Sequence, residues 1–155
     1  GLARTMGGID RSSWVSWASY SFAYVLAYGP KMDDEMGNAG PGLWILAGGI
    51  VAFFALIIPI QRHMQFSLTA STYGTPKRLV TTGPFRFSRN PIYVAFLVPM
   101  ASLAWFSIPA ALAGIGVYLL SMTYFVIARE EKVLEREFGS DFADYRTRVP
   151  RWILF

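Results

Sequence analysis

Four apolar segments dominate the chain and limit what it can fold into. They cover residues 13–28, 43–60, 91–106 and 109–128. A helix needs roughly 20 residues to cross a hydrocarbon core about 30 Å thick, and the second and fourth segments provide that length. The first and third segments are shorter, so they would cross with the help of tilt or a locally thinner bilayer. The pattern predicts an all-α, polytopic membrane protein with about four transmembrane helices.

Composition agrees with a membrane location. Hydrophobic residues make up 54% of the 155 residues and charged residues only 15%, whereas soluble domains average about 25% charged residues. The length suggests a single domain covering residues 1–155. The chain has no cysteine and one histidine, His63, which excludes disulfides, thiolate chemistry and a Cys/His metal site. We expect no metal and no nucleic acid as partners.

The connections between the apolar segments predict the topology. Residues 107–109 leave almost no loop between the third and fourth segments, so these should form a tight helical hairpin. The loop between the second and third segments is basic, and no acidic residue occurs between Met36 and Arg129. The loop between the first and second segments carries one lysine and three carboxylates. The positive-inside rule then places both termini and the basic loop in the cytoplasm.

The fourth segment is expected to continue past the membrane as an amphipathic helix. In REEKVLEREFG, the apolar residues Leu134 and Phe138 recur near a helical period, and charged residues occupy the other face. Gly139 is a reasonable C-cap for this helix. The sequence DFADYRTRVPRWILF follows; it is basic and aromatic, and we expect it to lie at the membrane interface.

The stretch GPFRFSRNPIY directly precedes the third segment and has several readings. Asn90 and Pro91 are favoured as N-cap and first residue of a helix. Arg86 and Arg89 would be explained by anchoring to lipid phosphates. Their interleaving with aromatic residues, Tyr93 among them, favours a pocket wall that holds an anion and stacks on a flat group.

Glu130 and Glu131 lie where the fourth segment leaves the membrane. Carboxylates near the bilayer are costly unless they are solvated or paired. They would form either a solvated helix face or a carboxylate pair facing the basic loop. The hairpin brings the start of the third segment beside the end of the fourth, so Asn90 and Glu130 should be neighbours. The loop, the carboxylates and the tail would then close over one cavity.

The two motifs resemble those of a known superfamily. TGPFRFSRNPIY, an apolar hairpin and IAREEKVLEREFGSDFADYRTRVPRWI are similar to the integral membrane methyltransferases, which include isoprenylcysteine carboxyl methyltransferases and phospholipid methyltransferases. The resemblance covers roughly residues 79–152, about half of the chain. It implies a cofactor, S-adenosylmethionine, held on the cytoplasmic side, and a lipophilic small molecule or lipid as the substrate, entering from the bilayer.

The resemblance and the chemistry of this cofactor together suggest site residues. A glutamate would pair with the cofactor's ammonium or ribose, an arginine or helix N-terminus with its carboxylate, and an aromatic ring with its adenine. The expected cofactor-binding residues are Gly83, Pro84, Phe85, Arg89, Asn90, Tyr93, Glu130 and Glu131. The expected substrate-binding residues are Arg86, Tyr145, Arg148 and Arg151. Glu130 and Arg146 are expected to take part in catalysis. His63 lies outside both motifs.

The methyl acceptor stays open at this point. The carboxyl methyltransferases usually have histidine where this chain has Asn90, which is more similar to the phospholipid branch. The tail arginines favour a carboxylate acceptor, because a carboxylate needs a cationic anchor and no general base. N-methylation of a phospholipid-type amine is the alternative. A membrane reductase that uses NADPH, and a non-enzymatic protein that binds lipid or a partner, are the other two classes.

Overall fold

The computed structural model describes residues 11–28, 41–68 and 78–154, and all regular secondary structure among these residues is helical. The elements in order are α1 (Arg11–Tyr28), α3 (Pro41–Leu68), η2 (Gly83–Arg86), α4 (Pro91–Ala95), α5 (Leu97–Ser102), η3 (Leu103–Trp105), α6 (Ile108–Ser121), η4 (Met122–Ile127) and α7 (Ala128–Arg148). The elements η2 and η3 are 3₁₀ turns, and η4 is a π-helical segment. The predicted all-α fold is confirmed for these residues.

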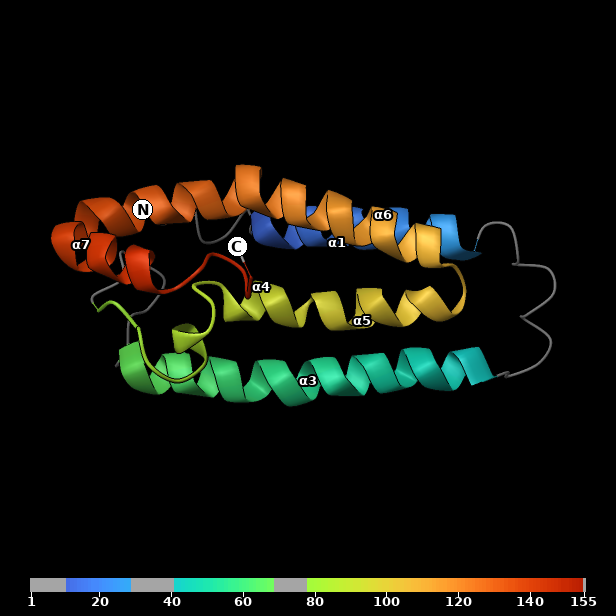
Figure 1. The fold of residues 1–155 in the computed structure, drawn as a ribbon. Helices are drawn as coiled ribbons and strands as arrows, with labels where there is room; N and C mark the ends of the chain where they lie inside the picture. The colour runs from blue at the N-terminus through green and yellow to red at the C-terminus, as the bar shows by residue number, and fades with distance from the viewer. Residues whose placement is uncertain (1–10, 29–40, 69–77, 155) are drawn as a thin grey trace, which may run out of the picture.

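The helices lie side by side as an elongated bundle (Figure 1). One layer holds α3, the next holds α4 and α5, and the last holds α1 and α6. The main contacts join α1 to α6 and α3 to α5. The chain turns directly from η3 into α6, which is the predicted hairpin. As a result the loop before α4 and the whole of α7 lie at the same end of the bundle.

Close approach of α1 and α6 depends on one glycine. A Cβ atom added at Gly114 would lie 2.4 Å from the Cβ of Ala23, whereas one added at Gly116 would meet nothing within 4 Å. Small residues at such positions let two helix backbones pack closely, which is a common device in membrane proteins. Further toward α7 the core is larger and includes Tyr118, Met122 and Trp152.

Within the described part of the chain, two helices are long and apolar enough to cross a membrane, Trp44–Met64 and Ile108–Arg148, and Pro91–Trp105 is a shorter apolar helix. Many apolar side chains of α3 face outward; Trp44 is 73% exposed and Val51 is 68% exposed. A soluble protein rarely exposes a continuous apolar surface of this kind, so lipid is the expected surrounding of α3.

The helices differ from the predicted segments in two places. The third segment is divided into α4, α5 and η3, because Pro99 has no N–H to donate to the carbonyl of Ala95 and its ring crowds that group. The fourth segment passes through η4 into α7 without interruption, as predicted. Gly139 has φ 48° and ψ −116° and bends α7, so the predicted helix end is confirmed, but a second helical stretch follows and turns back toward α4 (Figure 1).

Candidate functional site

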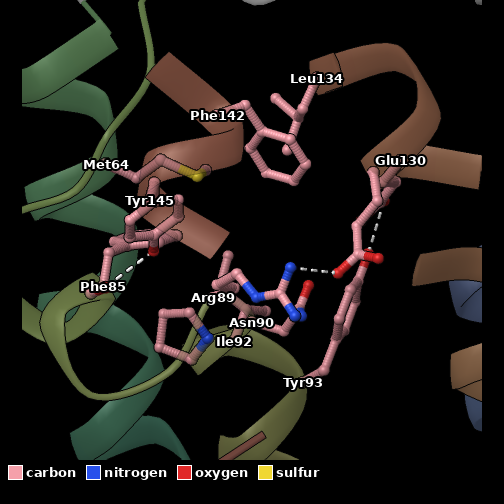
Figure 2. A pocket seen from close by; sticks show the side chains of 12 residues that line it. Met64, Phe85, Arg89, Asn90, Ile92, Tyr93, Glu130, Leu134, Phe142 and Tyr145 are labelled. Carbon is pink, nitrogen blue, oxygen red and sulfur yellow. Dashed lines mark hydrogen bonds and ion pairs between the residues drawn. The ribbon is translucent and has the colours of Figure 1, made fainter. Parts of the chain in front are cut away.

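A cavity of about 310 Å³ lies between the loop before α4 and the start of α7 (Figure 2). Its walls come from the end of α3, from the loop and first turn of α4, and from both halves of α7. The lining residues are Met64, Phe85, Arg89, Asn90, Pro91, Ile92, Tyr93, Glu130, Glu131, Leu134, Phe142 and Tyr145. The two sequence motifs therefore face one cavity, as the hairpin argument predicts.

The first turns of α4 and α7 are joined by a hydrogen bond. The hydroxyl of Tyr93 donates to Oε1 of Glu130 at 2.8 Å. Glu130 is an exposed residue, and Figure 2 shows its side chain reaching toward the cavity beside the Tyr93 ring. The bond fixes one carboxylate at the rim, across from the aromatic and arginine side chains of the loop.

Glu131, by contrast, is buried between two arginines. Its side chain is 11% exposed, Arg89 Nη1 lies 2.9 Å from its Oε1, and Arg151 Nη2 lies 2.5 Å from its Oε2. Arg151 Nε also donates to Oε1 at 3.1 Å, which makes the Arg151 pair bidentate. The hydrogen bond to Glu131 raises the pKa of Arg151. The cluster of two guanidiniums and one carboxylate carries a net positive charge.

Arg89 supplies that positive charge to the cavity. Its side chain is only 10% exposed, and burial lowers its pKa, an effect that the Glu131 charge opposes. Among the described residues, neither Nε nor Nη1 of Arg89 has a hydrogen-bond partner; the 2.9 Å approach to Glu131 is an ion pair without hydrogen-bond geometry. A buried guanidinium with unused donors is suited to bind an anion.

The C-terminal segment (residues 149–152) holds the loop in place. The backbone N–H of Arg89 donates to the carbonyl of Pro150 at 2.9 Å. The carbonyl of Arg151 accepts from Ser88 Oγ and from Asn90 Nδ2, each at 3.0 Å. Trp152 Nε1 donates to Thr123 Oγ1 at 3.2 Å. The tail is thus part of the site framework, beyond the interfacial role expected for it.

Asn90 differs from the expectation for an N-cap. It occupies the N-cap position of α4, yet its side chain makes no capping hydrogen bond. The amide instead donates to the C-terminal segment, and the backbone N–H of Asn90 donates to Ser88 Oγ. The predicted capping role of the side chain is therefore wrong; it joins two segments that are far apart in the sequence.

Tyr145 and its neighbours form the apolar wall. Its hydroxyl donates to the carbonyl of Phe85 at 2.7 Å, and burial raises its pKa to about 12. Phe142 and Val149 pack beside it, with Leu134 against the cluster. The side chain predicted to bind substrate lines the cavity and also fixes the backbone of the loop.

Other predicted site residues lie away from the cavity lining. Gly83 has φ 59° and packs against His63, so that a Cβ would lie 2.6 Å from His63 Nε2. That nitrogen lies 3.1 Å from the carbonyl oxygen of Thr82, so His63 supports the start of the motif. Pro84 follows Gly83 in η2. Neither Gly83 nor Pro84 lines the cavity.

The remaining predicted arginines lie outside the cavity lining. Arg86, Arg146 and Arg148 are exposed. Arg146 Nη1 lies 4.0 Å from Glu135 Oε1, and Arg148 Nε donates to the carbonyl of Asp144. Arg151 is occupied by Glu131. None of the four lines the cavity.

The expected site residues did not include the buried Ser88, nor five residues that line the cavity, Met64, Pro91, Ile92, Leu134 and Phe142. Met64 comes to the cavity from the end of α3, and only the packing of α3 against α4 brings it there. Ser88 is 2% exposed and links the loop to the tail. A buried serine inside a basic, aromatic stretch was the available signal for Ser88.

A sequence profile of the phospholipid methyltransferase family matches residues 42–141. This stretch makes up more than half of the chain. The chain belongs to the phospholipid methyltransferase family. The family consists of membrane methyltransferases that use S-adenosylmethionine, so the enzyme class and cofactor inferred from the motifs are confirmed. No solved structure gives a significant match.

Three relatives have curated descriptions. Methanethiol S-methyltransferase 1 of Bradyrhizobium diazoefficiens is 27% identical over 157 residues, which covers 91% of this chain and 53% of the relative. An uncharacterized protein of Haemophilus influenzae is 35% identical over 57 residues, 37% of this chain and 90% of the relative. The nickel-cobalt-cadmium resistance protein NccN of Alcaligenes xylosoxydans xylosoxydans is 37% identical over 73 residues, 46% of this chain and 34% of the relative. The chain thus spans about half of the first relative and a third of the last.

The cavity fits the family's cofactor by its chemistry. The unused donors of Arg89 suit a carboxylate. Glu130 suits an ammonium or ribose hydroxyls, since a carboxylate accepts hydrogen bonds from either. The rings of Phe85 and Phe142 line the apolar side, where an adenine would find stacking partners. The carboxylate, the ammonium or ribose, and the adenine of the cofactor would therefore each find a chemically suitable residue at the cavity.

Proposed function

We propose that this member of the phospholipid methyltransferase family transfers a methyl group from S-adenosylmethionine to a lipophilic acceptor that partitions into the membrane. One observation carries the proposal. The buried guanidinium of Arg89 has unused donors on the wall of a cavity whose rim holds Glu130. A site with separate places for an anion and a cation suits the amino-acid part of the cofactor.

The cofactor, when bound, supplies an already activated methyl group. The chain then has to bind the cofactor and the acceptor, orient them toward each other and exclude water. These effects can account for a large part of the rate enhancement of such a reaction. Arg89 would hold the carboxylate and Glu130 the ammonium or the ribose. Phe85, Phe142 or Tyr93 would stack on the adenine. Phe87, another aromatic residue of the stretch GPFRFSRNPIY, is 72% exposed and does not line the cavity, so we assign it no contact with the cofactor.

Glu131 has a different role from the one suggested by its place beside Glu130. Both of its oxygens are already engaged by arginines. Glu130 is the carboxylate at the rim, and it is the group that would take the proton from an acceptor that must lose one. Catalytic assistance is therefore assigned to Glu130 and not to Arg146, which is exposed and faces Glu135.

The first acceptor candidate is a lipophilic thiol. The relative that aligns with 91% of the chain is a methanethiol S-methyltransferase, and the cavity walls are largely apolar, with Met64, Ile92 and Leu134 among them. A thiol would need a proton acceptor, which Glu130 provides. The second candidate is a carboxylate, supported by Arg89; the tail arginines that favoured it have partners elsewhere or are exposed. An amine of the phospholipid type is third, supported by the family name.

The membrane arrangement is part of the proposal. Four crossings, made by α1, α3, the α4–α5 run and α6, would place the cavity and both termini at the cytoplasmic face, in line with the basic loop. Arg78, Arg86 and Arg89 belong to that loop. The acidic loop between α1 and α3 lies outside the described residues.

Methyl transfer tests the proposal directly. Purified protein in lipid vesicles is incubated with S-adenosylmethionine labelled at the methyl group, in separate reactions with a long-chain alkanethiol, a fatty acid or phosphatidylethanolamine. We expect label on one of these probes, lost in Arg89→Gln and retained in Arg136→Gln, an exposed residue of α7 outside the cavity. Base-labile label would identify an ester. Absence of label on all three, together with protection of the protein by NADPH, would replace the proposal with a reductase. Label that persists in Arg89→Gln and Glu130→Gln would refute the site.

A further inference from the structure

The two arginines of the ion-pair cluster at the cavity contact Glu131 unequally. Glu131 receives two contacts from Arg151, at 2.5 and 3.1 Å, and one from Arg89 at 2.9 Å. The contacts from Arg151 have hydrogen-bond geometry, and the one from Arg89 does not. The carboxylate is therefore oriented by Arg151 and only approached by Arg89.

This arrangement leaves Arg89 with donors to spare. If Glu131 were not held by Arg151, Arg89 would be its remaining partner, and arginine–carboxylate pairs tend to become bidentate. A bidentate pair would consume the Nε and Nη1 donors that now have no hydrogen-bond partner among the described residues. It would also cancel the positive charge that the cluster presents to the cavity.

We propose that Arg151 is a positioning residue, which by occupying Glu131 keeps the Arg89 guanidinium available for the carboxylate of the bound methyl donor. The inference rests on the proposed function and deepens it. Arg151 then affects the affinity for the cofactor through the side chains of Glu131 and Arg89, instead of binding the acceptor as expected from the sequence. The C-terminal segment, 20 residues beyond Glu131 in the chain, thus determines how the first motif binds its anion.

The backbone contacts of the C-terminal segment make the role testable. Ser88 and Asn90 donate to the carbonyl of Arg151, and the N–H of Arg89 donates to the carbonyl of Pro150. Any residue at position 151 keeps these carbonyls, and the Trp152 bond to Thr123 is also independent of the arginine side chain. Substitution at position 151 should therefore change the charge cluster while the segment stays attached.

The test compares two ligands that differ in the amino-acid part. S-adenosylhomocysteine carries the carboxylate and ammonium, and methylthioadenosine has the same adenosine and sulfur without them. Each is titrated calorimetrically into the wild-type protein and into Arg151→Gln, Arg151→Lys and the matched control Arg136→Gln. Arg136 is exposed on α7, and its substitution removes the same charge.

We expect Arg151→Gln to weaken S-adenosylhomocysteine about tenfold or more, the size of one charge-assisted hydrogen bond, and to leave methylthioadenosine unchanged. Arg151→Lys should restore part of the difference, and Arg136→Gln should match the wild type for both ligands. Equal weakening of both ligands in Arg151→Gln would mean a general structural role and would overturn the inference. Unchanged affinity for both would overturn it as well. A wild-type protein that binds neither ligand would refute the proposed function itself, a result distinct from either of these.

Discussion

Replacing Glu131 by glutamine should destabilise the protein far more than the same change at Glu130. The two glutamates are adjacent and chemically identical, yet the Glu131 side chain is 11% exposed between two arginines, while Glu130 is exposed and accepts a hydrogen bond from Tyr93. Glutamine keeps the size and one oxygen acceptor of glutamate, so the comparison isolates the charge.

The magnitude follows from the burial of the partners. Removing one member of a buried ion pair costs about 3–5 kcal/mol, because it leaves an uncompensated buried charge. The Arg89 side chain is 10% exposed, but that of Arg151 is 32% exposed and can be hydrated, so the low end, about 3 kcal/mol, applies. At roughly 2–4 °C per kcal/mol for a chain of this size, Glu131→Gln should lower Tm by roughly 6–12 °C. Glu130→Gln should change stability by no more than about 0.5 kcal/mol, as for most surface changes.

The assay is thermal unfolding of purified protein in detergent, followed by helical circular dichroism without cofactor, so that ligand binding does not add stability. All variants are heated at one scan rate, because unfolding of such proteins is often irreversible. Equal shifts for the two variants, or an unchanged Tm in Glu131→Gln, would refute the assignment of Glu131 to the charge cluster.

Three further substitutions have definite expected outcomes. Gly114→Ala should destabilise by about 1–3 kcal/mol by forcing α1 and α6 apart, since overpacked contacts cost that much, and Gly116→Ala, which has open space, should not; thermal unfolding of the pair checks this, and equal behaviour would contradict the close contact. Gly83→Ala should lower the Tm and also weaken S-adenosylhomocysteine, because a side chain at φ 59° is strained and would strike His63; an unchanged Tm would count against that backbone. Burial raises the pKa of Tyr145 from 10.0 to about 12. The stability that the wild type has over Tyr145→Phe should therefore be full below pH 10 and fall between pH 10 and 12, because the phenol ionises first in the unfolded state. Ultraviolet titration against Tyr145→Phe should show this phenol ionising near pH 12, and ionisation near pH 10 would contradict its burial.

Helix positions were largely predictable because the apolar segments are long and are separated by charged or proline-containing connections. Residues 107–109 alone fixed the hairpin, and the hairpin brought the two motifs to one end of the bundle. The breaks inside the third segment were readable in principle from Pro99, whose missing N–H interrupts the helix. The helical stretch beyond Gly139 was hidden, since a glycine at a helix end resembles a terminus whether or not another helix follows.

The division of labour within the site could not be read from the sequence. The sequence alone gives no ground to assign different roles to Glu130 and Glu131. Glu131 gains its second arginine only because residues 149–152 pack against the loop before α4. The same return diverted Arg151 from the substrate role expected for it. Met64 illustrates the other limit, because a residue that reaches a cavity from a distant helix leaves no local pattern.

We propose that the loop before α4 and both halves of α7 form one cofactor pocket. Hydrogen–deuterium exchange with and without S-adenosylhomocysteine, read by mass spectrometry of peptides covering residues 78–93 and 128–148, tests it most directly. We predict protection of both segments together, lost from both in Arg89→Gln. Absence of protection, or protection confined to one of the two segments or to a different part of the chain, would contradict it.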